Sequence, residues 1–369
     1  MAKKVILDLD TGIDDALAIF YCLGSPELEL IGITGTYGNV QVAQGVRNAL
    51  AILALCGRDD VPVFLGEPHA LSKKSFEVME ISEFIHGKNG IGNVGIPDAE
   101  RQPESMGAVD FIIESAHTYQ KDLLYIPTGP QTNMATALRK DPSIKDRIGR
   151  MILMGGALTV PGNVQPWAEA NINQDPEAAN ETFRSGLPAT MIGLDVTLQT
   201  LLTYKETQVW RDLNTPQGAF VADMTDYYIK AYETTAPYLG GCGLHDPLAV
   251  GVAADPSLVK CLDINMKVDT EDPVRGRTIG NEMKLNNSDK TMNVAVEVDV
   301  PRFLDEFMAR ITRVAQGLYF FGRLLSLWRL CEDGRHIKKD SRRAGEMAIL
   351  VRLTFFEGMC KFAHLPSST

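Results

Sequence analysis

Four aspartates stand within eight residues near the N-terminus, in the sequence Asp-Leu-Asp-Thr-Gly-Ile-Asp-Asp. They are Asp8, Asp10, Asp14 and Asp15. Carboxylates this close together repel one another unless a positive charge neutralises them. A bound cation is the simplest source of that charge, and ligands that are all oxygen favour calcium or magnesium. The alternative is that Asp14 and Asp15 only cap a helix and complement its dipole.

A second candidate is the His-Asp-Pro sequence at residues 245–247, which is typical of a loop that enters a helix. Asp246 would be a further metal ligand, and His245 would donate a proton near neutral pH. The alternative is a helix N-cap with an incidental histidine. This segment by itself does not separate the two interpretations.

A third candidate is the polar segment that contains Asn163, Glu169 and Asn171. Such side chains can hold sugar hydroxyls, because an amide both donates and accepts hydrogen bonds and a carboxylate accepts them. Taken alone, the segment is more typical of an ordinary polar loop before a capped helix. The glycine-rich segment at residues 86–92 could fold over a ligand, which makes His86 a candidate substrate-binding residue, although a plain surface loop is the more typical interpretation.

Strands and helices that alternate along the chain must position these residues. Short apolar runs predict strands over residues 5–9, 28–34, 61–64, 123–126, 150–154 and 190–194. Amphipathic or alanine-rich stretches predict helices over residues 14–23, 42–56, 108–119, 133–138 and 176–185. Strands that alternate with helices require crossover connections. The sequence therefore predicts an α/β fold with a single open, mainly parallel sheet flanked by helices.

Ligands of such sheets bind beyond the carboxyl ends of the strands. The predicted strands end at polar or glycine-rich turns, which cover residues 8–15, 37–39, 128–129 and 155–171. Glycine in these turns lets the backbone approach a ligand closely. We therefore expect the candidate residues to meet at one edge of the sheet.

Composition excludes several classes of protein. The chain has 369 residues, is 45% hydrophobic and carries a net charge of −11, so it can bury a large core and repels nucleic acid phosphates. The six cysteines are scattered without a CxxC pair, which argues against zinc and disulfide scaffolds and fits a reducing compartment, the cytoplasm. No secretory signal is recognisable, and no apolar run is long enough to span a membrane.

The C-terminal part differs from the rest of the chain. Residues 315–369 hold nine Lys and Arg against five Asp and Glu, a net charge of +4, which leaves −15 for residues 1–314. We therefore divide the chain into a domain at 1–314 and a basic, aromatic C-terminal extension at 315–369. The extension would bind a partner or a membrane surface, or it is a frameshifted or read-through segment without a selected role. The second interpretation is favoured, because the domain pattern ends so abruptly.

Taken together, these motifs resemble the nucleoside hydrolase family, also called the inosine–uridine preferring nucleoside hydrolases. The resemblance covers about residues 3–314. The aspartate cluster is followed in the family's order by motifs at residues 38–40, 127–133, 154–156, 169–171, 175–179, 245–247 and 293–299. The resemblance implies a Rossmann-related fold and calcium-dependent hydrolysis of the N-glycosidic bond of ribonucleosides to ribose and free base. It also implies assembly into homodimers or homotetramers.

The resemblance also implies roles for individual residues. Calcium would be held by Asp10, Asp15, Asp246 and the backbone carbonyl of Thr128, and Asp10 would also take a proton from the attacking water. The ribose would be held by Asp14, Asn39, Asn163, Glu169 and Asn171. His245 would protonate or shield the departing base. Such a site makes physical sense, because cleavage builds positive charge on the ribose, which carboxylates and amides stabilise.

Base preference follows less directly. The family usually has Phe where this chain has Ala170, so an aromatic wall near the substrate is missing. A helix 12–16 residues before the His-Asp pair contributes to selectivity in the family. Counting back gives Glu233 and Ile229, whereas a shift of one residue gives Tyr232 and Tyr228, and the sequence does not decide. His86 resembles the branches that accept pyrimidines or both kinds of base, so we expect pyrimidine nucleosides and inosine as substrates.

Two other functions compete with this interpretation. Haloacid-dehalogenase-like phosphatases also begin with an apolar strand and Asp-x-Asp, with Asp8 as the nucleophile beside Mg²⁺. Against this, Thr-Gly follows the pair where those enzymes prefer Gly-Thr, and Asp14 and Asp15 would have no role. The second alternative is a non-catalytic protein that binds calcium or a nucleoside, which only turnover of a nucleoside would distinguish.

Overall fold

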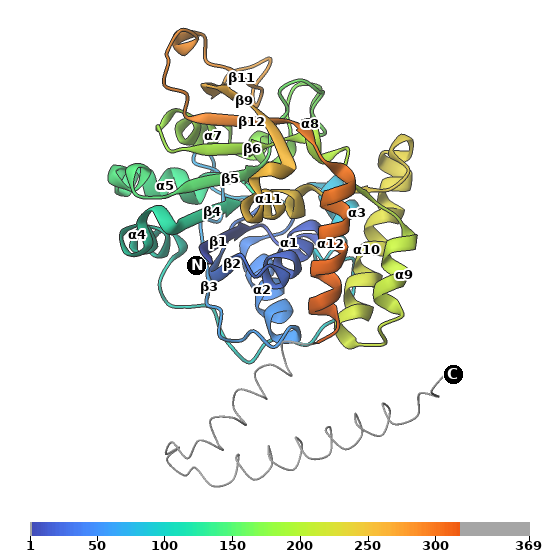
Figure 1. Ribbon diagram of the computed structural model, residues 1–369. Coiled ribbons are helices and arrows are strands. Elements are labelled where there is room, and N and C mark those ends of the chain that lie inside the picture. Colours follow the sequence, from blue (N-terminus) through green and yellow to red (C-terminus); the bar gives the residue numbers. More distant parts are fainter. Residues whose placement is uncertain (1, 318–369) are drawn as a thin grey trace, which may run out of the picture. The chain divides into compact units, whose positions relative to one another are not determined.

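An eight-stranded sheet flanked by helices forms the centre of the protein (Figure 1). The structure is a computed structural model that describes residues 2–317. The strands lie in the order β3 (Val63–Phe64), β2 (Leu28–Gly35), β1 (Lys3–Leu9), β4 (Leu123–Pro127), β5 (Arg150–Met154), β6 (Ala189–Ile192), β12 (Met292–Val298) and β9 (Val259–Ile264). All neighbours are parallel except β12 and β9. The predicted single, open, mainly parallel sheet is confirmed.

Helices cover both faces of the sheet, as Figure 1 shows. One face carries α4 (Ala108–Tyr119), α5 (Thr132–Lys140) and α7 (Pro176–Arg184). The other carries α1 (Ile13–Gly24), α2 (Val42–Leu55), α11 (His245–Ala254) and α12 (Val300–Ala315). Because both faces are covered, residues 5–9 of β1 are all buried, which explains why this strand is a continuous apolar run.

The remaining elements are shorter or lie beside the sheet. The other helices are α3 (Glu80–His86), α6 (Ala170–Gln174), α8 (Leu194–Thr197), α9 (Tyr204–Arg211) and α10 (Pro216–Thr235). Two small antiparallel sheets pair β7 (Leu201–Leu202) with β8 (Cys242–Gly243) and β10 (Met266–Val268) with β11 (Thr278–Gly280). The 3₁₀ helices are η1 (Gln120–Asp122), η2 (Pro142–Asp146), η3 (Pro237–Leu239), η4 (Pro256–Leu258) and η5 (Glu282–Lys284).

The order of the strands creates a crevice at the carboxyl end of β1. After β1 the chain moves outward through β2 to β3 and then returns to place β4 on the opposite side of β1. The connections that follow β1 and β4 therefore diverge, which is where doubly wound sheets bind their ligands. Asp10 follows β1 and Thr128 follows β4, and the Thr128 N–H donates to the Asp8 carbonyl at 2.9 Å.

One predicted strand ends too late. The apolar run at residues 190–194 predicts strand throughout, but β6 ends at Ile192 and Leu194 already begins α8. The chain turns at Gly193, where a side chain would meet the backbone oxygen of Gly156. A close approach of two backbones, which periodicity does not reveal, ends this strand.

The predicted domain boundary and C-terminal extension lie near or beyond the end of the described residues. The domain boundary at 314 stays a prediction, and α12 continues to Ala315. Residues 318–369, which make up nearly all of the predicted extension, lie outside the described residues. Within residues 2–317, no helix is long and apolar enough to cross a membrane.

Aromatic rings attach α12 to the helix that carries two of the aspartates. Phe303 and Phe307 of α12 stack on Tyr21 of α1, with ring centroids 6.1 and 6.0 Å apart. Both phenylalanines are fully buried. The guanidinium of Arg310 lies over the same tyrosine ring, 5.2 Å from its centroid. The last described helix therefore stabilises the element from which the site is built.

We expect Phe307→Ala to lower the free energy of unfolding by about 3–5 kcal/mol, because it leaves a cavity against Tyr21. Urea denaturation followed by circular dichroism measures the change. Asp305→Ala on the exposed side of α12 is the matched control and should change stability by less than about 0.5 kcal/mol. Equal effects of the two substitutions would show that this aromatic packing does not hold α12.

Candidate active site

A cavity of about 740 Å³ lies beyond the carboxyl ends of the central strands. The predicted site residues that line it are Asp14, Asn39, His86, Thr128, Asn163, Glu169, Asn171, His245 and Asp246. Asp10 and Asp15 are fully buried and do not line the cavity, but both are hydrogen-bonded to residues that do. The tertiary structure therefore brings together residues from distant parts of the sequence.

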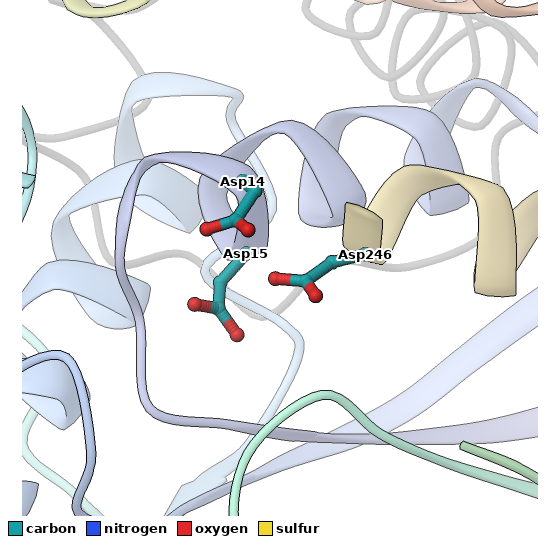
Figure 2. A group of neighbouring side chains, drawn as sticks. All are labelled: Asp14, Asp15 and Asp246. Atoms are coloured by element: carbon teal, nitrogen blue, oxygen red, sulfur yellow. The ribbon is translucent and has the colours of Figure 1, made fainter. Parts of the chain in front are cut away.

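Three carboxylates converge at one end of this cavity. Figure 2 shows Asp14 and Asp15 at the start of α1 and Asp246 at the start of α11, with their carboxylates turned toward a common space. One oxygen atom from each lies within 4.8 Å of the others. The predicted ligand set contained Asp10 in place of Asp14. Asp10 lies beside this group and is close enough to raise the pKa of Asp246.

Several oxygens of these carboxylates have no hydrogen-bond partner among residues 2–317. They are Asp10 Oδ1, Asp14 Oδ1 and Asp246 Oδ2. A buried carboxylate oxygen without a partner costs free energy. An all-oxygen set of this kind fits a hard divalent cation.

Neighbouring groups orient the other carboxylate oxygens. Asp10 Oδ2 accepts the N–H of Asn39 at 2.6 Å. Asp15 Oδ2 accepts the N–H of Gly12 at 2.7 Å, and Asp15 Oδ1 accepts the hydroxyl of Thr128 at 2.6 Å. Asp15 therefore satisfies a backbone amide at the start of α1, as the helix-capping interpretation expects, and it also belongs to the acidic cluster.

Burial changes the protonation of the cluster. It raises the pKa of Asp14 and of Asp15 to about 6, and the charge of Asp14 adds to the effect on Asp15. The pKa values of Asp10 and Asp246 are raised well above the ordinary carboxyl value, again chiefly by burial and then by neighbouring carboxylates. The cluster therefore retains protons unless a cation replaces them.

Asp8 belongs to a different environment. It is fully buried, and its Oδ1 accepts the Thr34 hydroxyl at 2.6 Å and the Asn133 amide at 2.7 Å. Asp8 does not line the cavity. It ties β1 to β2 and α5, which contradicts the phosphatase alternative, in which Asp8 would be an accessible nucleophile.

Asn171 and Glu169 are held by the backbone. The Asn171 amide donates to the Thr128 carbonyl at 2.7 Å, so it orients the carbonyl that was predicted as a metal ligand. Glu169 is the N-cap of α6, where it accepts the N–H of Asn171 at 2.9 Å and also that of Gly156 at 2.9 Å. The capped-helix interpretation is thus correct for Glu169, although its carboxylate also lines the cavity.

Asn163 is the most exposed of the predicted ribose ligands. Its Oδ1 accepts the N–H of Ala170 at 2.9 Å, which connects the loop to the start of α6. Asp195 of α8 also holds this loop, through hydrogen bonds to its backbone. Asp195 accepts the N–H of Leu158 at 2.9 Å and that of Thr159 at 2.6 Å. No motif in the sequence predicts this contact.

His86 is buried and hydrogen-bonded to the start of α1, unlike a residue of an exposed surface loop. It is buried at the end of α3, so the prediction of a surface loop is wrong for this residue. Its Nδ1 accepts the N–H of Ile13 at 3.1 Å and lies 3.8 Å from Asp14 Oδ1. Burial lowers the pKa of His86 to about 4, which makes the ring neutral at pH 7.

His245 lies between two hydroxyl groups. Its Nδ1 is 2.8 Å from the Thr197 hydroxyl, and its Nε2 is 2.7 Å from the Tyr232 hydroxyl. Burial lowers the pKa of His245 to about 4, so the ring is neutral at pH 7. Any proton that it provides must then come from a neutral N–H group and not from an imidazolium ion.

The structure decides which residues of α10 face the site. Tyr228 and Tyr232 line the cavity, whereas Ile229 and Glu233 do not. The Tyr228 hydroxyl donates to Asp14 Oδ2 at 3.3 Å, and the Tyr232 ring lies edge-on to that of Tyr228. The only signal in the sequence was the spacing of two tyrosines by four residues, which places them on one face of a helix.

Comparison with known proteins identifies the family. The model of the inosine-uridine preferring nucleoside hydrolases matches residues 5–305. The chain belongs to this family. It is 36% identical to probable uridine nucleosidase 2 of Arabidopsis thaliana over 316 residues, which cover 84% of this chain and 97% of that protein. It is 32% identical to the pyrimidine-specific ribonucleoside hydrolase RihA of Escherichia coli over 312 residues, covering 84% and 99%.

Solved structures agree with the family assignment. A purine-preferring ribonucleoside hydrolase from Gardnerella vaginalis is 69% identical, with a TM-score of 0.85 and coverage of 85% of this chain and 99% of that chain. The plant nucleoside hydrolase PpNRh1 is 34% identical, with a TM-score of 0.79 and coverage of 85% and 99%. As a member of the nucleoside hydrolase family, the chain is an N-ribosyl hydrolase.

Without divalent cations, the protein should become less stable as the pH rises from acidic to neutral. With a chelator, we expect the melting temperature to fall between pH 5 and pH 7.5. The folded cluster holds protons up to a pKa of about 6, whereas the unfolded carboxyls lose them near the ordinary value of 3.8. Calcium at 100 times its Kd should restore about 2.7 kcal/mol at pH 7.5 and much less at pH 5.

Scanning calorimetry at both pH values, with chelator and with calcium, measures these effects. A chelated protein that became more stable with rising pH would contradict the raised pKa values of these carboxyl groups. Equal stabilisation by calcium at both pH values would show that cation and protons do not compete for the cluster.

Gly38 tests the placement of Asp10 without removing a polar group. A side chain at Gly38 would overlap Asp10 Oδ2, which accepts the neighbouring Asn39 N–H. We expect Gly38→Ala to displace the carboxylate at a cost of about 1–3 kcal/mol, and to weaken calcium binding at least about tenfold. Isothermal titration with calcium measures the change.

Gly95→Ala is the matched control, because a side chain there meets nothing within 4 Å among the described residues. It should bind calcium as the wild type does. Unchanged calcium affinity in Gly38→Ala would mean that Asp10 does not need this orientation.

Proposed function

We propose that the protein catalyses calcium-dependent hydrolysis of the N-glycosidic bond of ribonucleosides to ribose and free base. The observation that carries this proposal is a cluster of buried carboxylates with unpartnered oxygens at one end of a cavity whose wall holds the Tyr232–His245 pair. Carboxylates at one end and a hydrogen-bonding aromatic wall at the other match the two halves of a nucleoside.

Calcium would be held by Asp10, Asp15, Asp246 and the carbonyl of Thr128, with Asp14 beside them. When bound, calcium supplies positive charge that orients the ribose diol and lowers the pKa of a nearby water molecule. The unpartnered oxygens of Asp10 and Asp246 support this choice of ligands. Sites that combine several carboxylates with a carbonyl oxygen suit calcium, which takes more oxygen ligands than smaller cations do.

Asp10 acts as the general base. Its Oδ2 is fixed by the Asn39 N–H at 2.6 Å, while its buried Oδ1 has no partner among the described residues and would accept a hydrogen bond from a water molecule that enters the acidic cluster with the substrate. As the water oxygen forms its bond to C1 of the ribose, Asp10 takes one of the water protons and later releases it to solvent. The bond between C1 and the base nitrogen breaks, and its electron pair leaves with the base.

The ribose would be held by Asp14, Asn39, Asn163, Glu169 and Asn171. Positive charge develops on the sugar ring as the bond to the base weakens. Carboxylates and amide oxygens that are already oriented stabilise this charge without reorganising. The fixed hydrogen bonds of Glu169 and Asn171 to the backbone support this role.

Tyr232 and His245 serve the departing base. The Tyr232 hydroxyl gives its proton to the base nitrogen or oxygen, and the N–H of His245 stabilises the phenolate oxygen until solvent returns a proton. Burial raises the pKa of Tyr232, which keeps this hydroxyl protonated until the base leaves. His86 and Tyr228 complete the aromatic wall against which the base packs.

We propose that purine nucleosides, including inosine, are substrates together with uridine. The sequence favoured pyrimidine nucleosides and inosine, and the Arabidopsis and Escherichia coli relatives support pyrimidines. The purine-preferring relative is 69% identical, twice the identity of the others, which supports a preference for purine nucleosides. A cavity of about 740 Å³ has room for either base beside ribose.

We further propose a reducing compartment, the cytoplasm. Cys22, Cys56, Cys242 and Cys261 are the cysteines within residues 2–317, and none of them forms a disulfide there. Assembly into a homodimer or homotetramer stays a prediction from the family resemblance.

Replacement of the general base tests the proposed function. We expect the wild type to release ribose from inosine, adenosine, uridine and cytidine in the presence of calcium. Asp10→Ala should lower kcat by about 10²–10⁴-fold, because the carboxylate that takes the water proton is lost. A reducing-sugar assay measures ribose release for each nucleoside and ranks the bases.

Asp122→Ala, an exposed aspartate that pairs with Lys3, is the matched control and should retain wild-type activity. If calcium bound but no nucleoside released ribose, the non-catalytic alternative would replace this proposal. Full activity of Asp10→Ala would assign the base to another carboxylate.

A further inference from the structure

Thr197 contacts His245 but does not itself line the cavity. It is fully buried at the end of α8. Its hydroxyl oxygen is 2.8 Å from Nδ1 of His245. A ring nitrogen either donates or accepts in such a contact, so the contact bears on which ring nitrogen holds the proton.

The direction of the hydrogen bond follows from burial. The Thr197 hydroxyl has no other hydrogen-bond partner in the described part of the chain. If Nδ1 donated to Thr197, the hydroxyl proton would be left without an acceptor in a site closed to water, which is costly. The hydroxyl therefore donates to Nδ1, and the proton of the His245 ring lies on Nε2.

The proton on Nε2 determines how His245 is hydrogen-bonded to Tyr232. A protonated Nε2 donates to the Tyr232 oxygen, 2.7 Å away, so the phenol proton does not point at His245. The neighbouring Tyr228 donates its own proton to Asp14 Oδ2. The Tyr232 O–H is then turned away from His245, toward the cavity, where the departing base competes with the neighbouring Tyr228 oxygen for this proton. With the opposite tautomer, Tyr232 would donate to Nε2 and present only lone pairs to the departing base.

We propose that Thr197 is a positioning residue that fixes the tautomer of His245, so that Tyr232 offers its proton to the departing base. This inference rests on the proposed function. The position of Thr197 is itself constrained, because α8 begins at the turn where Gly193 approaches Gly156 and where Asp195 accepts two backbone amides. The donor chain runs from Thr197 through His245 to Tyr232.

The dependence of the rate on the leaving group tests this inference. Inosine and uridine need a proton on the departing base, whereas p-nitrophenyl β-D-ribofuranoside releases p-nitrophenolate, which leaves as a stable anion. We expect Thr197→Val to lower kcat on the two nucleosides by about 10–100-fold, less than the about 10²–10⁴-fold contribution of a general acid, because Tyr232 is misdirected and not removed. On p-nitrophenyl riboside, kcat should stay within about threefold, because no proton is needed.

Two further variants separate positioning from simple packing. Thr197→Ser keeps the hydroxyl and should restore most of the activity on nucleosides. In a Tyr232→Phe background, Thr197→Val should cause little further loss, because the hydroxyl that it orients is absent. Thr182→Val is the matched control, since Thr182 is buried in α7 and its hydroxyl has no partner among residues 2–317.

Equal losses on nucleosides and on p-nitrophenyl riboside would overturn the inference and leave Thr197 with a packing role. Additive losses in the Tyr232→Phe background would also overturn it. If Thr197→Val does not fold, Thr197→Ala provides the same comparison with a smaller side chain. A wild type that hydrolyses p-nitrophenyl riboside and no nucleoside would reject the proposed function, which is a different outcome from either of these.

Discussion

The mutual repulsion of buried carboxylates at the carboxyl end of β1 is the constraint on which the rest of this structure depends. The charge of Asp14 raises the pKa values of Asp10, Asp15 and Asp246, in a region that burial has already made unfavourable for charge. Backbone amides and one hydroxyl stabilise part of this charge. The remaining carboxylate oxygens have no hydrogen-bond partner among the described residues. A divalent cation and a ribose diol could neutralise and hydrogen-bond to these oxygens.

Stabilisation of these charges and construction of the cavity use the same groups. Glu169 caps α6 and also lines the cavity, and Asp15 accepts an amide at the start of α1 while it belongs to the acidic cluster. Asn171 holds the carbonyl of Thr128 in place. A side chain that already accepts two or three hydrogen bonds cannot rotate freely, so the ribose end of the cavity is organised before any substrate arrives.

The base end of the cavity is organised differently. Its rings are buried and neutral, and their hydrogen bonds run in one direction, from Thr197 through His245 to Tyr232. The short helix α8 joins the two ends, because Asp195 anchors the loop that carries Asn163 while Thr197 contacts His245. This helix has only four residues, and no periodicity in the sequence predicts it. It therefore connects the part of the site proposed for the sugar with the part proposed for the base.

The sequence by itself determined the parallel sheet, most of its strands and the residues of the acidic cluster, because these depend on short-range order. An apolar run between two covered faces predicts a strand such as β1, and eight residues are enough to bring together Asp8 to Asp15. Only the tertiary structure decided that Asp8 turns away from the site, that β6 ends at Ile192, that Tyr228 and Tyr232 face the cavity and that Thr197 stands behind His245. Those outcomes depend on contacts between segments far apart in the chain, where a rotation of one helical position or a close approach of two backbones has no local signature.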